Sequence, residues 1–559
     1  MEDCPLWASG NPQDHAAVQH GASGECRQDY ILKIDVLPRL VATNTFKRTS
    51  TMANFKLFQS HKQKQTATDT YNEAGGRAYT QTPAQQLAQL AATGCLNSTY
   101  YASAEMQLAQ VLDLARAVSP EFLAKTAIYA RERGYMKDMP ALLLAVLAAR
   151  DVALCAAVFD RVIDSGKMLR NFAQIVRSGV AGRKSFGTRP KKLIQNWLNR
   201  ASEQQLLNAA IGNNPSLADV VKMVHPQPHD AWRAAWFAWL IGKPYDAAAL
   251  PPLTAAFETY KRERRGALPP VPFQMLTALD LGCGAWTQIA ADGSWQQVRQ
   301  NLNTFARHGV FGKDKHIRRA RVMPYQLLTT WQAAGDAMPG AIRDALQDAM
   351  ETAVQNVPQL PGNIVVCPDV SGSMHSPVSG YRAGGTGKTR CIDVAALIGA
   401  AVLRHNPQAR VIPFEITTVN IRLNPRDSIM TNAEKLAGIG GGGTACSAPL
   451  ALLNREKARV DMVILVSDNE SWADQHHGHK SALLVEWDIL KQRCPQAKLV
   501  CIDIQPYTAA QIKNRTDILN IGGFSDHVFS LLGDFAAQNS GDDHWVHHIE
   551  AIELLRQAA

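Results

Sequence analysis

Oxygen-bearing side chains follow a short apolar segment in the C-terminal third of the chain. Asp369, Ser371 and Ser373 lie in the sequence Asp-Val-Ser-Gly-Ser, just after the apolar residues 364–367. Where a strand runs into a loop, this spacing can direct one carboxylate and two hydroxyls toward one point. By itself, the pattern also fits a serine-rich turn that holds no ligand.

Two further oxygen donors occur later in the sequence. Thr444 follows four glycines at 440–443, and Asp468 follows the apolar run 462–466. Glycine lets the backbone approach a ligand closely because it has no Cβ. Carboxylates and hydroxyls suit hard cations, whereas zinc prefers cysteine and histidine. We therefore predict a divalent metal site, most simply for Mg²⁺, formed by Asp369, Ser371, Ser373, Thr444 and Asp468.

Strands and helices are expected to alternate around these donors. Short β-branched runs predict strands at 364–367, 410–414, 462–466 and 499–504, with helices at 392–404 and 482–493. This alternation is typical of a parallel, doubly wound α/β sheet, in which ligands bind at the carboxyl ends of the strands. Asp369 and Asp468 both follow such strand ends.

These residues and the surrounding α/β pattern resemble the metal-ion-dependent adhesion site of a von Willebrand factor A domain. The resemblance implies that Ser371 and Ser373 bind the metal directly, and that Thr444 binds it directly or through water. It implies that Asp369 and Asp468 act directly or through a second layer of water. It also implies one coordination position open to a partner's carboxylate. Pro368, which removes a backbone donor before Asp369, and the glycine-rich stretch 375–390 depart from that pattern.

Other chemistry at this site has weaker support. The sequence Gly-Gly-Thr-Gly-Lys-Thr at 384–389 lacks the first glycine of a phosphate-binding P-loop, because Arg382 occupies that position. No nucleophile or general base is placed beside the metal donors by sequence, although His375 and Glu470 remain open as candidates. We therefore expect a protein that is not an enzyme, with a Mg²⁺-dependent phosphohydrolase as a third-ranked alternative.

The region before the predicted sheet has helical periodicity. From about residue 84 to 357, apolar residues recur at three- and four-residue spacing, as in 140–150 and 154–163. Short Gly, Pro and Asn breaks divide this region into helix pairs without a strict repeat, which is typical of a HEAT-like solenoid. We predict a tail at 1–64, with translation starting either at Met1 or at Met52, a helical-repeat domain at 65–361, an A domain at 362–535 and a C-terminal helix at 536–559.

The strongest charge bias lies within the helical region. Residues 161–200 contain ten Lys or Arg and a single acid, Asp164. The run from 177 to 200 places bases on a glycine-containing loop and on the first turn of a helix, where they can bind phosphates without reading sequence. Phe172 and Phe186 could stack on unpaired bases, whereas the helical spacing of Trp197 favours core packing. A solvated helix face is the alternative, and residues 313–321 form a second basic cluster.

Composition limits the class of protein. The 559 residues are 46% hydrophobic and 19% charged, which excludes a disordered or collagen-like chain. Lys and Arg number 58 and Asp and Glu 49, and residues 1–361 hold 40 of these bases against 29 acids, so a polyanion would bind the N-terminal part. Ten scattered cysteines and the lack of an apolar run of about 18 residues predict a reduced, cytoplasmic protein that does not span a membrane.

The ordered set of motifs resembles the TROVE family, named for telomerase, Ro and vault proteins, and in particular its Ro ribonucleoprotein branch with its bacterial members. The likeness covers about 65–535. It is carried by GGRAYTQTPAQQLAQLAATGCLNSTYYAS, GRKSFGTRPKKLIQNWLNR, DVVKMVHPQP and NIVVCPDVSGSM. The resemblance implies helical repeats closed into a ring through the A domain, small noncoding Y-like RNA on the outer basic face, and single-stranded ends of misfolded RNA in the central hole.

By matching segment, the resemblance assigns RNA binding to Arg177, Arg183, Lys184, Arg189, Lys191, Lys192 and His225. A helix cap is the ordinary alternative for the histidine. The resemblance also makes an exoribonuclease or another RNA-processing protein a plausible partner. The rival function is an A-domain adaptor that binds a protein carboxylate through its metal. The sequence does not identify the RNA, the protein partner or the oligomeric state.

Overall fold

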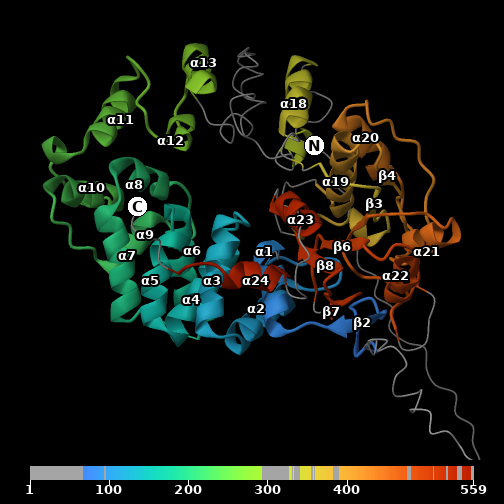
Figure 1. Ribbon diagram of the computed structural model, residues 1–559. Coiled ribbons are helices and arrows are strands. Elements are labelled where there is room, and N and C mark those ends of the chain that lie inside the picture. Colours follow the sequence, from blue (N-terminus) through green and yellow to red (C-terminus); the bar gives the residue numbers. More distant parts are fainter. Residues whose placement is uncertain are drawn as a thin grey trace, which may run out of the picture. The chain divides into compact units, whose positions relative to one another are not determined.

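A computed structural model defines most of the chain after the N-terminal tail (Figure 1). The described residues are 67–93, 96–182, 184–292, 327–329, 331–332, 340–353, 357, 359–381, 389–474, 480–507, 509–523, 527–537 and 544–554. The predictions for the tail at 1–64, for Arg183, for the basic cluster at 313–321 and for most of the segment 384–389 lie outside these residues.

Helices dominate the described residues between 83 and 353, as the periodicity predicts. Their bounds are α1 (Pro83–Thr93), α2 (Ala104–Ala117), α3 (Pro120–Glu132), α4 (Asp138–Arg150), α5 (Val152–Val162), α6 (Gly166–Ser178), α7 (Thr188–Arg200), α8 (Glu203–Ala210), α9 (Leu217–Val224), α10 (Ala231–Ile241), α11 (Pro252–Glu263), α12 (Phe273–Thr277), α13 (Cys283–Asp292) and α18 (Gly340–Ala353), with a 3₁₀ turn at η1 (Ala247–Ala249).

Local sequence explains where several of these helices begin. Ser103 and Ser119 accept hydrogen bonds from backbone N–H groups in the first turns of α2 and α3. Ser202 forms a reciprocal capping box with Gln205 at the start of α8. Each cap satisfies donors that have no partner inside the helix, which favours a helix start at that residue.

The C-terminal third contains the predicted parallel sheet. Its strands are β3 (Ile364–Pro368), β4 (Arg410–Val411), β5 (Met462–Ser467), β6 (Lys498–Asp503) and β8 (Ile518–Gly522), in the order β4-β3-β5-β6-β8. The helical elements are η3 (Ser373–His375), α19 (Cys391–His405), α20 (Ile429–Ala437), α21 (Ala448–Arg455), α22 (Ala482–Arg493), α23 (His527–Ala537) and α24 (His544–Glu550). All neighbouring pairs of strands are parallel.

Alternate residues of the strands face opposite sides of this sheet. Val366 and Ile464 pack into the core that contains α19 and α20, whereas Val365 and Val463 pack into the core that contains α21 and α22. Helices therefore cover both faces, as a doubly wound sheet requires. Figure 1 shows these helix pairs around β3 and β6.

Two sequence predictions of secondary structure need correction. The strand expected at 410–414 ends at Val411, because Pro413 has no N–H to donate to a ladder, and Phe414 instead forms isolated bridges with Asp369 and Thr418. The C-terminal segment is not one helix over 536–559. In the described residues α23 ends at Ala537 and α24 occupies His544–Glu550.

The beginning of the helical region joins the A domain through a second, small sheet. This sheet has the order β1 (Thr70–Tyr71), β2 (Arg77–Thr80) and β7 (Ala509–Ala510). Tyr79 and Thr80 pair antiparallel with Ala510 and Ala509. The end of the helical region also contacts the A domain, since Gln347 donates to the Ser428 hydroxyl at 2.7 Å and Glu351 pairs with Arg404 at 3.0 Å.

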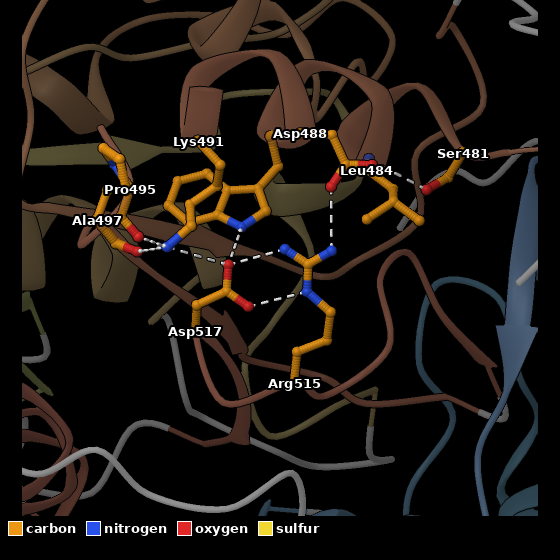
Figure 2. Close-up of polar contacts among 9 residues, drawn as sticks. Ser481, Leu484, Asp488, Lys491, Pro495, Ala497, Arg515 and Asp517 are labelled. Carbon is orange, nitrogen blue, oxygen red and sulfur yellow. Dashed lines mark hydrogen bonds and ion pairs between the residues drawn. The ribbon is translucent and has the colours of Figure 1, made fainter. Parts of the chain in front are cut away.

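A polar network fixes α22 to the loop before β8 (Figure 2). Arg515 donates to both carboxylate oxygens of Asp517 at 2.8 Å and to Asp488 at 3.0 Å. The indole Nε1 of Trp487 and the ammonium of Lys491 also face Asp517, at 2.9 and 3.5 Å. Although burial alone would raise it, the hydrogen bonds and charge of Arg515 hold the pKa of Asp517 below its ordinary value.

No helix in the described part of the chain combines the length and apolarity needed to cross a membrane.

Candidate functional site

The five predicted metal donors lie together at the carboxyl ends of β3 and β5. Asp369 begins the loop after β3, and Asp468 directly follows β5, the neighbouring strand. Gly372 N–H donates to the Gly442 carbonyl at 2.9 Å, which brings the glycine-rich segment before Thr444 to the Asp369–Ser373 loop. All five side chains are buried, with exposed fractions of 0 to 5%.

Glycine is required where these loops touch. A Cβ on Gly441 would lie 2.9 Å from the Cα of Gly372, closer than real side chains approach a backbone. The glycine run therefore lets the segment that leads to Thr444 pack directly on the Asp369–Ser373 loop.

Hydrogen bonds orient the donors. Asp369 accepts from the Ser371 N–H at 2.8 Å and from the Ser467 hydroxyl at 2.6 Å. The hydroxyl oxygens of Ser371 and Ser373 are 3.5 Å apart. The two hydroxyls and the carboxylate thus face a common space, as the Asp-x-Ser-x-Ser spacing predicts.

The site carries buried negative charge without a basic partner. Neither Asp369 nor Asp468 forms an ion pair with a described residue. Burial, and then the charge of Asp468, raise the pKa of Asp369 to about 7, and burial raises the pKa of Asp468 as well. A bound cation would compensate both carboxylates, so the donor set fits a hard divalent ion.

The hydroxyls are needed to complete such a site. Among the described residues, no group of three or more His, Cys, Asp or Glu side chains could hold a metal ion by itself. The two candidate catalytic groups are otherwise engaged. Glu470 is 1% exposed and accepts from the Ala74 N–H at 2.9 Å, and the His375 ring contacts Arg390 at 3.0 Å.

The basic segment lies on α6, α7 and the loop between them. Helix α7 buries Pro190, Ile194, Trp197 and Leu198, which leaves Lys191 and Lys192 on its outer side. The indole of Trp197 donates to the Ile163 carbonyl at 3.2 Å, so this residue belongs to the core, as its spacing predicts.

Phe172 and Phe186 are not stacking platforms. Both are buried, at 0% and 6% exposure, and Phe172 packs edge-on against Phe159. Their side chains fill the core between the helices, and the prediction that they stack on bases is wrong.

Ion pairs neutralise two of the ten bases, and a third is buried. Arg161 pairs with Glu132, Arg200 pairs with Asp160, and the buried Arg170 donates to backbone carbonyls. Five candidates remain without a polar partner among the described residues, and they are exposed or half-buried: Arg177, Lys184, Arg189, Lys191 and Lys192.

His225 is the C-terminal cap of α9. Its φ is 49°, and its N–H donates to the Val221 carbonyl at 2.9 Å. The side chain amide of Gln195 in α7 donates to the carbonyls of Val224 and His225 at 2.6 and 3.1 Å. The exposed His225 therefore lies next to the basic helix, and its backbone role is the cap that the sequence offered as the ordinary alternative.

Proteins of known family are similar to this chain, both over the A domain and over most of its length. Residues 363–536 match the family described as the Ro60 von Willebrand factor A domain. The RNA-binding protein RO60 of Deinococcus radiodurans is 24% identical over 513 residues, covering 83% of this chain and 94% of that protein. Residues 363–536 are therefore a von Willebrand factor A domain of the Ro60 type, and the chain as a whole is similar to RO60 proteins.

A second RO60 protein and a solved structure are also similar to this chain. RO60 of Caenorhabditis elegans is 24% identical over 237 residues, covering 40% of this chain and 35% of that protein. The solved Ro (Rsr) protein of D. radiodurans matches with a TM-score of 0.56 at 21% identity, covering 82% of this chain and 100% of that one. The chain thus shares the fold of that structure.

Residues beyond those predicted also position the candidate metal donors. Ser467 orients Asp369, and a signal for it existed in the Val-Ser-Asp sequence that ends β5. The N–H of Ala74, 396 positions earlier in the chain, donates at 2.9 Å to Glu470, which lies two residues after Asp468. No sequence spacing indicates such a contact, because it depends on how the helical region folds back onto the A domain.

Proposed function

We propose that this chain is an RNA-binding scaffold of the Ro type, which binds small noncoding Y-like RNA and single-stranded ends of misfolded RNA in RNA quality control or processing. The observation that carries the proposal is the set of five basic side chains on α6, α7 and their loop that have no acidic partner among the described residues. The relatives named as RNA-binding proteins support the same function.

The geometry of this surface suits phosphates. Lys184 lies over the C-terminal cap of α6, since a Cβ on Gly179 would be 2.8 Å from its Cγ. Arg189, Lys191 and Lys192 occupy the first turn of α7, which contains no acidic residue. The positive end of the helix dipole adds to their charge, so the surface attracts a nucleic acid backbone. With Phe172 and Phe186 in the core, this surface binds backbone rather than stacked bases.

The further parts of the proposal concern architecture and partners. The helical region contacts the A domain near both of its ends, through β2 and β7 and through Gln347 and Glu351, which supports a HEAT-like ring closed through that domain. Single-stranded RNA ends would enter the centre of such a ring. A cytoplasmic location and an exoribonuclease or other processing protein as partner complete this hypothesis.

We also propose that Asp369, Ser371, Ser373, Thr444 and Asp468 hold Mg²⁺. The buried, unpaired carboxylates and the converging hydroxyls support this assignment. The ion would neutralise the carboxylates and hold the two loops together. The chain's own residues give no support to hydrolysis, since Glu470 is buried against the N-terminal hairpin.

The deciding experiment is the recovery and sequencing of RNA that copurifies with the full chain. We expect structured small RNA, whose affinity falls steeply with salt, by a log–log slope of about −0.7 to −0.9 per phosphate contacted. An Asp369→Ala variant should lose divalent binding but retain RNA affinity, because the metal site and the basic surface belong to different elements. A flat salt response, together with tight binding of a protein through the metal, would favour the adaptor function instead.

A further inference from the structure

The outer edge of the A-domain sheet is open at β4. This strand ends the sheet, and among the described strands only β3 pairs with it. Ile412 N–H donates to the Val366 carbonyl at 2.9 Å, so the N–H and C=O of the preceding residue, Val411, point away from β3. Neither group bonds to another described residue. An edge with free backbone groups can pair with a further strand.

The chain returns past this edge without closing it. Val419 N–H donates to the Pro413 carbonyl at 2.7 Å, which starts an antiparallel return beside the end of β4. Beyond this bond, none of the backbone groups of residues 420–423 bonds to β4. The returning segment, residues 418–423, therefore does not become the next strand, and the edge at Val411 remains unpaired.

A cavity lies between β4 and the returning segment. Its volume is about 460 Å³, which is within the size range of ligand pockets. Eight of its twelve lining residues are aliphatic, and none is aromatic. Leu403 of α19 and Leu452 of α21 bound the cavity from helices that cover opposite faces of the sheet. Because successive side chains of a strand point to opposite faces, a strand added at this edge would meet an apolar wall on both sides.

The rim of this cavity is basic. The segments that line or flank it, 409–412, 418–424 and 452–459, contain five Lys or Arg and a single acid, Glu456. Arg410 pairs with this acid, with 3.0 Å between Arg410 Nη2 and Glu456 Oε1. Four exposed bases form no ion pair with a described residue: Arg422, Arg455, Lys457 and Arg459. The charge of the rim is therefore complementary to an acidic partner.

We propose that the outer edge of β4 binds an extended acidic segment of a partner protein, which adds to the sheet as a further strand. Its main chain bonds to Val411, consecutive apolar side chains contact the two walls of the cavity, and flanking Asp or Glu side chains face the basic rim. A nucleic acid suits this site less well, because the cavity is apolar and offers no aromatic ring for stacking. The inference depends on neither the metal site nor RNA binding.

The test is fluorescence anisotropy of a labelled peptide pool titrated with the full-length protein. In this pool, a central run of Val, Ile or Leu lies between pairs of Asp or Glu. A matched pool has Lys or Arg at the flanking positions. We expect the acidic pool to bind at least about tenfold more tightly than the basic pool, with an affinity that falls as salt rises. Failure of the acidic pool to bind, or equal binding of both pools, would overturn the inference.

Substitutions at the edge and in the cavity locate the bound peptide. Val411→Pro removes the outward N–H but no bond to β3, which is where an edge strand tolerates proline, and should weaken binding of the acidic pool at least about tenfold. Leu452→Asp puts a charge in the apolar wall and should weaken binding similarly, which covers the case in which Val411→Pro does not fold by circular dichroism.

The matched control is Ile489→Asp, at a residue of α22 that is 41% exposed and does not line the cavity. It should leave peptide binding unchanged. Wild-type affinity in the folded Val411→Pro and Leu452→Asp variants would overturn the site. Loss of RNA affinity in Arg422→Glu, without binding of the acidic pool to the wild type, would assign the basic rim to RNA and overturn peptide docking.

Discussion

The hydroxyl of Ser467 donates a 2.6 Å hydrogen bond to Asp369 Oδ2 and so links the ends of two neighbouring strands, β5 and β3. Both residues are buried. The bond leaves the other carboxylate oxygen, which accepts from the Ser371 N–H, oriented within the donor loop. Ser467 therefore positions a metal donor without being one of the five.

Substitution Ser467→Ala should weaken divalent binding without abolishing it. Loss of an outer hydrogen bond to a metal ligand typically costs about 10–100-fold in affinity. Calorimetric titration with Mn²⁺ measures this change. Asp369→Ala is the reference for complete loss, and an unchanged dissociation constant in folded Ser467→Ala would show that the bond does not orient the carboxylate.

Charge reversal at Lys191 and Lys192 should weaken binding of structured RNA. Each lost phosphate contact is expected to lower the salt slope by about 0.7–0.9, and at low salt the double Glu variant should bind at least about tenfold more weakly. The melting temperature should barely change, because these side chains have no ion-pair partner among the described residues.

The matched control for that experiment reverses two exposed bases of the A domain, Arg455 and Arg459. It makes the same change in net charge at a site away from α7. If both double variants lose affinity equally, total charge rather than the surface on α6 and α7 explains RNA binding.

A fragment that ends at residue 361 should be less stable than the full chain. It loses the β2–β7 pairing, the contacts of Gln347 and Glu351, and the packing of Trp545 in α24 against Tyr129. We expect a lower and broader thermal transition by circular dichroism. Cooperative melting of residues 52–361 at the full-length temperature would indicate two independent domains.

The Arg515 network should make stability depend on acid pH. The pKa of Asp517 is lowered in the folded state, so its contribution is present above the unfolded value of about 3.9 and is lost as pH falls through the lower, folded value. Arg515→Ala should cost about 1–3 kcal/mol near pH 7, since it removes the bonds from Arg515 to Asp488 and Asp517 that Figure 2 shows.

The difference in melting temperature between wild type and Arg515→Ala should therefore shrink as pH is lowered from 6 to 3. Arg459→Ala, at an exposed base without an ion pair among the described residues, is the control and should show no such trend. A difference that stays constant over this pH range would mean that Arg515 acts through packing alone.

Local sequence determined the elements and the donor motif. The helix at 482–493 has the predicted bounds, and α19 extends one residue beyond the predicted 392–404 at each end. Hydrophobic periodicity and helix-breaking residues depend only on residues close together in the sequence, so the bounds of helices and strands can be predicted from the sequence alone. The same holds for Asp369, Ser371 and Ser373, whose spacing on one loop already brings their side chains together.

Only the tertiary structure decided which of these residues remain available and what covers them. The ten bases in residues 161–200 predicted a single basic surface. In the structure, Glu132 and Asp160 neutralise two of these bases, and Arg170 is buried in the core. Ala74 donates to Glu470, beside the donor Asp468, because the chain folds back over 396 positions. Such contacts depend on long-range packing and ion pairing, in which residue type alone does not specify the partner.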